Sequence, residues 1–339
     1  MKIENKDLLD RIFSKSSIVD YSHFIKHSLY DDKYGYYKNK DISKDFFTSP
    51  ITHDSFGKII SKQLKDVWDH YNKPRQFIIV ELGGNSGKLK EDILASISKN
   101  KKFFNSVIYL NIDEINGENL VDIEFEGELG CIVSNEFFDA LPFNRYLKDE
   151  EGIKELLVKF DNGKLIEVTK KIKKFKFLSN DITSKIPHGS TFEVIQGLDL
   201  ACKKLSSLFN YCVMITIDYG YNDYNKLFFK NPSGLVRCYS KHSMDKNILE
   251  NIGKKDITCD VNFNYLDESL NKYGFCKIGN TSQEKFLIKN GFRTFFDNSK
   301  NEAEKRNLIS LVNPDGMGGF HVYFHEKPNT NFLPACLKN

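Results

Sequence analysis

The segment Phe77–Gly87 constrains the fold most, because it has the pattern of a strand, a tight turn and the start of a helix. Four apolar residues lead to Glu81 and to a turn with glycines at positions 83, 84 and 87, and apolar residues recur at helical spacing from Leu89 onward. A turn of this kind brings backbone amides and a helix N-terminus close to a ligand. The segment predicts the nucleoside-cofactor site of a doubly wound α/β fold.

Two classes of cofactor compete for this turn. A dinucleotide site prefers Gly-x-Gly-x-x-Gly, whereas the chain has Glu-x-Gly-x-x-x-Gly, with Gly83, Gly84, Asn85 and Gly87 in the turn itself. S-adenosylmethionine (SAM) has no pyrophosphate, so Glu81 can bind its ribose or face its cationic methionine end. The spacing favours SAM over NAD. A buried strand with a glycine turn and no ligand is the alternative interpretation.

Two more predicted strands end in polar residues. Val107–Ile112 ends in Asp113, at the place where a ribose lies in a doubly wound fold, and Cys131–Ser134 runs into Asn135 and Glu136. These groups are expected at the same crevice as the glycine turn, where a carboxylate can orient or deprotonate a nucleophile. Alternatively, Asp113 is a solvated loop acid, and Asn135 and Glu136 merely cap a helix.

Composition excludes several functional classes. With a net charge of +3, the chain gives no argument for nucleic acid or an anionic membrane as a main partner. No apolar run is long enough to span a membrane, and residues 1–17 resemble neither a signal peptide nor a good transit peptide. The seven cysteines are scattered and form no Cys-x-x-Cys pair, so we expect reduced thiols, no metal site and a cytoplasmic protein.

The rest of the chain gives a coarse order of elements. We expect an aromatic loop at 30–50, an irregular segment at 222–260 that includes a lone His242, and a hairpin at 152–176 that turns at Asn162 and Gly163. Helices are predicted at 6–30 (two short ones), 54–71, 198–209, 263–273, 283–290 and 301–312. Further strands are predicted at 121–125, 213–217, 275–278 and 320–325, the last in an antiparallel pair.

Several motifs occur together in an order that resembles the MidA-like SAM-dependent methyltransferases. They include Tyr34-Gly35-Tyr36-Tyr37, Asp45-Phe46-Phe47-Thr48-Ser49-Pro50, Glu81-Leu82-Gly83, Asn135-Glu136-Phe137-Phe138-Asp139-Ala140-Leu141-Pro142, Asp218-Tyr219-Gly220-Tyr221 and Asp256-Ile257-Thr258. The resemblance extends from about residue 20 to 325. That family includes the mitochondrial arginine methyltransferase that assists assembly of respiratory complex I.

The resemblance implies an α/β fold with a class I SAM-methyltransferase, Rossmann-like sheet, mostly parallel with an antiparallel last strand. It also implies N-terminal helices and an inserted lid or substrate subdomain. The expected ranges are 1–76 for the N-terminal part, 77–150, 190–222 and 260–330 for the core, and 151–189 and 223–259 for the insertions.

The resemblance also implies roles for individual residues. Glu81, Gly83, Gly84, Asn85, Gly87, Asp113, Thr48 and Ser49 would bind SAM, and Glu136, Asn135 and Asp139 would be catalytic. Asn85 stands where the family commonly has a glycine, and Asn tolerates positive φ better than other side chains do.

Methylation of a protein arginine or another nitrogen nucleophile is the first hypothesis for function. A small-molecule O- or N-methyltransferase is the enzymatic alternative, and a non-catalytic assembly or binding protein with the same fold is the alternative from another class. The expected methyl acceptor is thus a protein or a small molecule. The sequence leaves open whether the chain forms a homodimer. The expected location is the cytoplasm, or the mitochondrial matrix if the source is eukaryotic.

Overall fold

The chain folds into two compact units that each combine several stretches of sequence. The structure, a computed structural model, describes residues 5–39, 48–113, 127–240 and 243–338. Unit 1 comprises residues 1–46, 138–198 and 220–266, and unit 2 comprises residues 47–137, 199–219 and 267–339. The predicted strand at 121–125, the motif residues Asp45, Phe46 and Phe47, and His242 lie outside the described residues.

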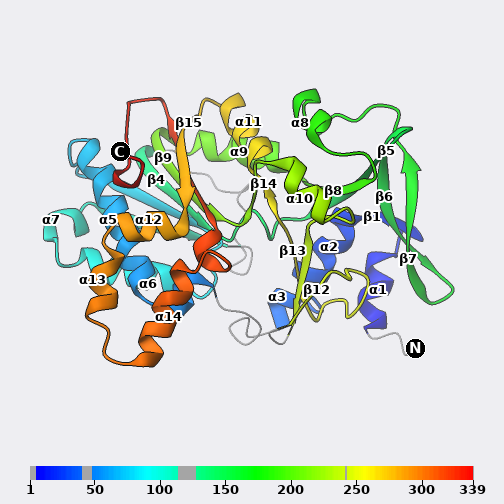
Figure 1. Cartoon of the computed structure of the whole chain (residues 1–339), viewed down its shortest axis with the longest axis horizontal. Helices are drawn as coiled ribbons and strands as arrows, with labels where there is room; N and C mark the ends of the chain where they lie inside the picture. Colours follow the sequence, from blue (N-terminus) through cyan, green and yellow to red (C-terminus); the bar gives the residue numbers. More distant parts are fainter. Residues whose placement is uncertain (1–4, 40–47, 114–126, 241–242, 339) are drawn as a thin grey trace. The chain divides into compact units, whose positions relative to one another are not determined.

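Unit 2 is built on a six-stranded sheet (Figure 1). Its strands, in spatial order, are β15 (Cys276–Ser282), β16 (His321–Lys327), β9 (Phe209–Asp218), β4 (Gly127–Asn135), β2 (Phe77–Leu82) and β3 (Val107–Ile112). The pairs β2/β3, β2/β4 and β4/β9 are parallel, whereas β16 runs antiparallel to both β9 and β15. The prediction of a parallel sheet with an antiparallel strand near the C-terminus is therefore confirmed.

Continuous apolar sequence explains why the central strands are buried. Every residue of β2 is buried, as expected for a parallel strand that is covered on both faces. The helices of this unit are α4 (Ser49–Thr52), α5 (Ser55–His70), α6 (Lys88–Ile97), α7 (Lys101–Phe104), α9 (Leu198–Ser207), α12 (Gln283–Lys289), α13 (Phe292–Asp297) and α14 (Glu302–Val312). Helix α11 (Phe263–Lys272) begins in unit 1 and ends in unit 2.

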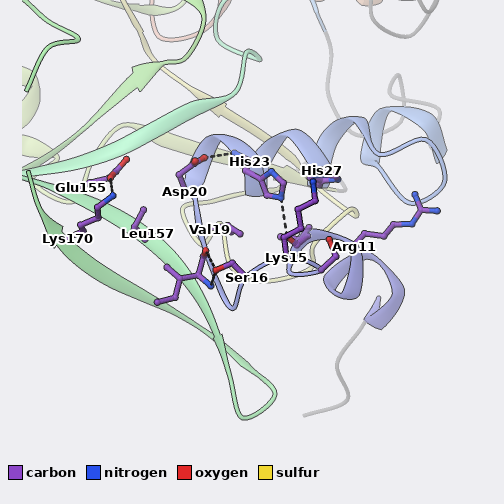
Figure 2. Close-up of a pocket in the computed structure, with 13 residues that line it drawn as sticks. Arg11, Lys15, Ser16, Val19, Asp20, His23, His27, Glu155, Leu157 and Lys170 are labelled. Carbon is purple, nitrogen blue, oxygen red and sulfur yellow. Dashed lines mark hydrogen bonds and ion pairs between the residues drawn. The ribbon is translucent and has the colours of Figure 1, made fainter.

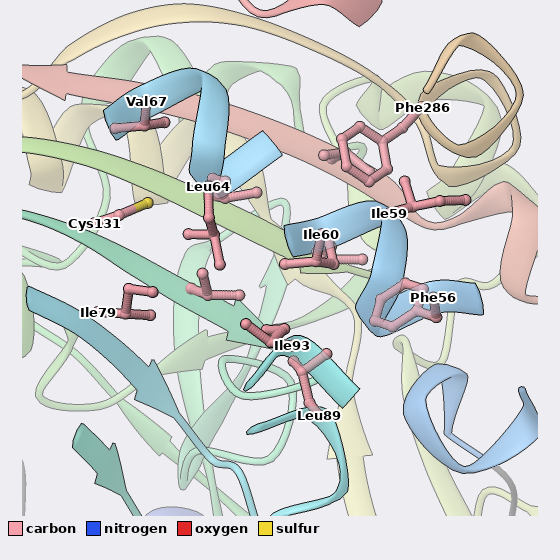
Figure 3. Close-up of a cluster of buried hydrophobic side chains, with 14 of the residues drawn as sticks. Phe56, Ile59, Ile60, Leu64, Val67, Ile79, Leu89, Ile93, Cys131 and Phe286 are labelled. Carbon is pink, nitrogen blue, oxygen red and sulfur yellow. The ribbon is translucent and has the colours of Figure 1, made fainter. Parts of the chain in front are cut away.

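One apolar cluster holds helices α5, α6, α12 and α14 against this sheet. Figure 3 shows Phe56, Ile60 and Leu64 of α5 facing strand residues such as Ile79 and Cys131. Their helical spacing gives α5 a wide apolar face, and that face is removed from water by the sheet. This core fixes α6, and with it the turn between β2 and α6.

Unit 1 contains a five-stranded sheet and a smaller three-stranded sheet. The first is formed by β1 (Ile18–Asp20), β5 (Phe143–Asp149), β6 (Gly152–Asp161), β7 (Lys164–Lys171) and β8 (Ser190–Ile195). The second is formed by β11 (Val236–Ser240), β12 (Ser243–Asp245) and β13 (Asp256–Cys259), and β10 (Gly220–Tyr221) pairs with β14 (Val261–Asn262). The helices are α1 (Lys6–Ile12), α2 (Tyr21–Tyr30), α3 (Tyr36–Asn39), α8 (Asn180–Lys185) and α10 (Tyr224–Lys230).

The structure confirms some predictions for this unit and corrects others. The hairpin of β6 and β7 turns at Asn162 and Gly163, as predicted, and Asp20 caps α2 by accepting a hydrogen bond from the His23 amide. The segment 222–260 is not irregular, because it forms α10 and strands β11, β12 and β13. The unit boundaries also differ from the predicted ranges: β5 pairs with both β6 and β8 in unit 1, whereas β5 and β8 were assigned to the core.

Candidate cofactor and catalytic site

The turn between β2 and α6 has the backbone conformation that its glycines predict. The φ angles of Gly83, Asn85 and Gly87 are +71°, +42° and +77°, all in the left-handed region. Asn85 thus adopts the positive φ that Asn was expected to tolerate at a position where the family commonly has glycine. Its amide donates a hydrogen bond to Asp113 Oδ2, so the acid after β3 is tied directly to the turn.

Gly84 allows two polar side chains to approach the turn closely. A Cβ at this position would lie 2.3 Å from Asn111 Oδ1 and 2.7 Å from Glu81 Cδ. Asn111 stands opposite Glu81 in the pairing of β3 with β2. Asn111 Oδ1 is buried and has no hydrogen-bond partner among the described residues. The turn, Glu81 and Asn111 therefore form one compact polar site at the carboxyl end of the sheet.

Glu81 is a buried carboxyl group with an altered acidity. It is 2% exposed, and the Tyr109 hydroxyl donates a hydrogen bond of 2.9 Å to its Oε2 atom. Burial raises the pKa of Glu81 to about 7; the Tyr109 hydrogen bond opposes this change, and the charge of Asp113 adds to it. Since Asp113 and Glu81 interact electrostatically, the structure brings together the two acids that were predicted to share a crevice.

Glu136 follows β4 directly, and neither Asn135 nor Glu136 enters a helix. Asn135 is the last residue of β4, and Glu136 has a φ of +50°, which is uncommon for a residue of this type. The Glu136 amide donates to the Ile217 carbonyl over 2.9 Å, and Asn135 Nδ2 donates to Glu136 Oε1 over 3.1 Å. The helix-capping alternative is therefore wrong.

The next residue links this segment to the glycine turn. A Cβ built on Gly83 would lie 3.1 Å from Cδ2 of the Phe137 ring, so the ring packs against the turn. Asn135 Oδ1 is buried and has no hydrogen-bond partner among the described residues. The ends of β2, β3 and β4 thus bring Glu81, Asp113, Asn135 and Glu136 to one edge of the unit 2 sheet.

The two residues predicted from the loop before α4 differ in accessibility. Thr48 precedes α4 and is partly exposed, and its carbonyl accepts a hydrogen bond of 3.0 Å from the Thr52 hydroxyl. Ser49 is fully buried, and Gln283 Nε2 donates to its hydroxyl over 3.1 Å. Ser49 is therefore bonded to α12 inside unit 2, and its contact with SAM stays a prediction.

Asp139 belongs to unit 1, where it lies among tyrosines and acids. It is 3% exposed, and its carbonyl accepts a hydrogen bond of 3.0 Å from the Cys259 amide. The Tyr37 hydroxyl donates to Asp256 Oδ1 over 2.7 Å. Burial raises the pKa of Tyr37 well above its usual range, and the charges of Asp256, Tyr30 and Asp139 add to the effect. Of the three predicted catalytic residues, unit 2 holds only Asn135 and Glu136.

Sequence reasoning missed Tyr109 and Asn111 as members of this site. Both lie on β3, at alternate positions that continue to Asp113. Because side chains at alternate strand positions share a face, the period of two was the available signal. The prediction considered only Asp113 at the end of this strand and not the side chains within it.

Other features of the described residues bear on function. No group of three or more His, Cys, Asp or Glu side chains within the described ranges could hold a metal ion. None of the helices in the described part of the chain is long and apolar enough to cross a membrane. All seven cysteines are free thiols.

Comparison with known proteins gives consistent results. A family model described as "Putative S-adenosyl-L-methionine-dependent methyltransferase" matches residues 59–120 and 117–281. The mitochondrial protein arginine methyltransferase NDUFAF7 of Xenopus tropicalis is 23% identical over 92% of this chain and 83% of its own length. The human protein of the same name is also 23% identical, over 92% of this chain and 80% of its own length.

Solved structures show the same fold. A superfamily member from Burkholderia thailandensis, solved with bound S-adenosyl-homocysteine, superposes with a TM-score of 0.81 at 18% identity over 97% of this chain and 93% of that one. A second structure from that organism, solved in its native form, has a TM-score of 0.80 at 18% identity, covering 98% of this chain and 93% of that one. The curated relatives are named mitochondrial proteins, and a cytoplasmic location for this chain stays a prediction.

Proposed function

Because the chain belongs to this family of S-adenosyl-L-methionine-dependent methyltransferases, we propose that it methylates a nitrogen nucleophile, and that this nucleophile is an arginine side chain of a protein. The observation that carries the proposal is Glu136, a carboxylate in an uncommon backbone conformation at the end of β4. Strained backbone at such a position is typical of functional residues. The curated relatives named above as protein arginine methyltransferases support the choice of acceptor.

The residues around the glycine turn fit the cofactor. Gly84 lets the Asn111 and Glu81 side chains lie close against the turn, and Glu81 supplies a carboxyl group whose ionised form would be stabilised by a cationic ligand. We assign the ribose hydroxyls to Glu81 and Asp113, and the backbone contacts to Gly83, Gly84 and Asn85. Gly87 begins α6, and Thr48 lies beside a helix that packs against α6. When bound, SAM supplies an electrophilic methyl group on a sulfonium centre.

Glu136 is proposed to orient the guanidinium group of the acceptor and to neutralise part of its charge. A guanidinium group is planar and always charged, so its nitrogen becomes nucleophilic only when its N–H groups are oriented and part of its charge is neutralised. The carboxylate of Glu136 can accept from such N–H groups, and Asn135 holds one of its oxygens through the hydrogen bond of 3.1 Å. Methyl transfer would form a new N–C bond as the C–S bond of SAM breaks, which would release S-adenosylhomocysteine, and the methylated nitrogen would then lose one proton to solvent.

We also propose that unit 1 includes the lid or substrate subdomain that was predicted at 151–189 and 223–259. Asp139 of this unit lies in a group of acids and tyrosines that includes Tyr37 and Asp256. Carboxylates beside aromatic rings suit recognition of a guanidinium group, which both donates hydrogen bonds and stacks.

Incubation with labelled SAM tests the function directly. The purified protein is added to a cell lysate with methyl-labelled SAM, and labelled species are separated and identified. Label on arginine residues of a protein, absent with Glu136→Gln, is the expected result. Label found only in small molecules would overturn the choice of acceptor. Absence of any transfer, together with absence of SAM binding by calorimetry, would overturn catalysis itself.

The acidity of Glu81 leads to a pH-dependent cofactor affinity. With a pKa of about 7, Glu81 is mostly protonated at pH values below neutrality, and a cationic ligand favours its ionised form. SAM affinity is therefore expected to rise with pH up to about 7 and to level off above it, with proton release on binding near pH 6.5. Calorimetry in buffers of different ionisation enthalpy measures that release.

The same pKa predicts a change in stability. The folded pKa lies above the unfolded value of 4.5, so the folded state keeps a proton that the unfolded state loses, and stability falls as pH rises from 4.5 to 7. Above pH 7 the cost reaches about 3 kcal/mol as an upper estimate. Glu81→Gln should remove both the proton release and this fall in stability. A wild-type affinity that is independent of pH would contradict the assignment.

A further inference from the structure

A buried acid at the end of β9 lies beside the proposed catalytic segment. Asn135 stands opposite Ile217 in the parallel pairing of β4 with β9, and the Glu136 amide donates to the Ile217 carbonyl over 2.9 Å. Asp218, the next residue of β9, is fully buried, and its Oδ1 atom accepts a hydrogen bond of 3.0 Å from the Tyr219 amide. The reaction assigned to Glu136 does not use this second acid of the same sheet edge.

His321 stands on the other side of Asp218. Strand β16 runs antiparallel to β9 and begins at this edge of the sheet, where His321 is paired with Asp218. Side chains directly opposite each other on antiparallel strands have Cβ atoms about 5 Å apart. The His321 ring also contacts the ring of Tyr323, two positions along β16, with centroids 6.1 Å apart. Glu136, Asp218 and His321 therefore lie side by side at the ends of three adjacent strands.

Two of these three residues are accessible to an acceptor group. Glu136 and His321 are partly exposed, whereas Asp218 between them is not. Adjacent strands lie about 4.8 Å apart, so two such spacings place the backbones of Glu136 and His321 about 10 Å from each other. Both side chains extend several ångströms from the backbone. A guanidinium group that Glu136 orients would therefore lie within reach of the imidazole ring.

The start of β16 is held firmly. The Phe320 carbonyl accepts a hydrogen bond of 2.7 Å from the Gln283 amide, and the Phe320 ring contacts the Tyr219 ring with centroids 5.4 Å apart. A side chain on a fixed strand is positioned more precisely than one on a loop. His321 thus has the support that a residue in direct contact with the acceptor needs.

Of the histidines that the structure describes, only His321 ends a strand at this edge. His23 and His27 line a groove of unit 1 (Figure 2), and His188 also belongs to unit 1. His53 lies between α4 and α5, outside the sheet. The remaining two contact other elements: His325 Nε2 is 2.8 Å from Asp267 of α11, and His70 Nε2 is 2.7 Å from Thr330, which follows β16.

The proposed reaction needs a group that takes up a proton. Methyl transfer adds positive charge to the guanidinium group, and loss of a proton from the methylated nitrogen relieves it. If Glu136 took this proton, it would lose the negative charge with which it orients the acceptor. Asp218 is fully buried, so a proton on its carboxylate could not pass directly to water. A partly exposed imidazole can both accept a proton and release it near neutral pH.

We propose, resting on the arginine methylation proposed above, that His321 is a further catalytic residue, which takes the proton from the methylated nitrogen and releases it to water. The lone pair of one imidazole nitrogen forms a new N–H bond as the N–H bond of the methylated guanidinium group breaks, and water then removes the proton from the imidazolium. Asp218 is a positioning residue, because a carboxylate opposite the ring favours one ring orientation and stabilises the imidazolium.

Initial rates of label transfer test the role of His321 in the intact protein. The probe is methyl-labelled SAM, with cell-lysate protein as the acceptor. His321→Ala is expected to lower the rate of transfer to arginine about 100-fold and to leave SAM affinity, measured by calorimetry, unchanged. Imidazole added to the assay should restore part of the lost rate, since it can occupy the space that the ring leaves. Sodium chloride at the same ionic strength should restore none.

Asp218→Asn tests the positioning role. It should lower the rate about tenfold in the wild-type protein and have no further effect in His321→Ala, because it acts through the ring. His70→Gln is the matched control and should keep the wild-type rate. His70 is a partly exposed histidine of the same unit, and it lies near Glu326, toward the end of β16 opposite to His321.

The outcomes are distinct. A loss of rate with His321→Ala that imidazole partly restores, and that His70→Gln does not share, supports the proposal. A wild-type rate with His321→Ala, or a loss that imidazole leaves unchanged, would overturn it. An equal loss from Asp218→Asn with and without His321 would overturn the positioning role. Thermal melts establish that each variant is folded. An inactive wild type would overturn the methylation itself, whereas an active wild type with an equally active His321→Ala overturns only the role of His321.

Discussion

Glu136→Gln is expected to lower turnover about 100-fold while leaving SAM binding unchanged. The substitution keeps the size of the side chain and an oxygen that Asn135 Nδ2 can still donate to, but it removes the negative charge. In the proposed mechanism, the negative charge of Glu136 orients the guanidinium group of the acceptor and neutralises part of its positive charge during methyl transfer. Loss of this negative charge therefore lowers the rate of methyl transfer and does not affect SAM binding. Initial rates with labelled SAM measure turnover, and calorimetry measures SAM affinity.

The matched control for this variant is Glu128→Gln. Glu128 lies on the same strand, β4, near the end opposite to Glu136, and its Oε2 atom accepts a hydrogen bond of 2.9 Å from Asn210 Nδ2. It is exposed, so the same chemical change there should leave turnover as it is. Equal rates for wild type and Glu136→Gln would remove Glu136 from the catalytic role. Loss of SAM binding in the same variant would move Glu136 from the acceptor side to the cofactor side.

The sequence was sufficient to predict the strands and the turn that form the proposed cofactor side of this site. Strands β2 and β3 lie at 77–82 and 107–112, and the second of these coincides with its predicted range. Buried parallel strands have continuous apolar runs that end at a turn or an acid, and this makes them conspicuous in a sequence. The positive φ of Asn85 was also predictable, because few side chains tolerate that conformation.

Other features could not be predicted from local pattern. Glu136 has a φ of +50°, although Glu rarely adopts it, and its amide pairs with the Ile217 carbonyl of a distant strand, a contact that the local sequence does not display. Asp139 is three positions further along the chain, yet the boundary between the two units falls after Phe137. Such a boundary depends on contacts between residues far apart in sequence, and a single sequence does not display them.

The segment 222–260 illustrates the same limit in another way. Strand β11 spans five residues and pairs with β13, which begins sixteen positions after β11 ends. The alternation of Val236, Arg237 and Cys238 is too short to distinguish this strand from a loop until its partner strand is known.

Gly84→Ala is expected to weaken SAM binding at least about tenfold, because small displacements of a preorganised site are costly, and to destabilise the protein by about 1–3 kcal/mol. The added methyl group would lie 2.3 Å from Asn111 Oδ1 and 2.7 Å from Glu81 Cδ, far inside van der Waals contact. Either the turn or both polar side chains must move, and Glu81 is one of the side chains assigned to the ribose of the cofactor. Calorimetry with SAM and urea denaturation measure the two effects.

Two further variants separate crowding from the general cost of replacing a turn glycine. A Cβ at Gly87 would meet nothing within 4 Å, and Asn accepts its φ of +77°, so Gly87→Asn should cost little stability. The double variant Gly84→Ala, Asn111→Ala lacks the atom closest to the new methyl group. It should therefore be more stable than Gly84→Ala alone. If the double variant recovers stability but not SAM affinity, Asn111 itself contributes to the cofactor site. If Gly84→Ala binds SAM as the wild type does, the close approach at this turn has no role in holding the cofactor.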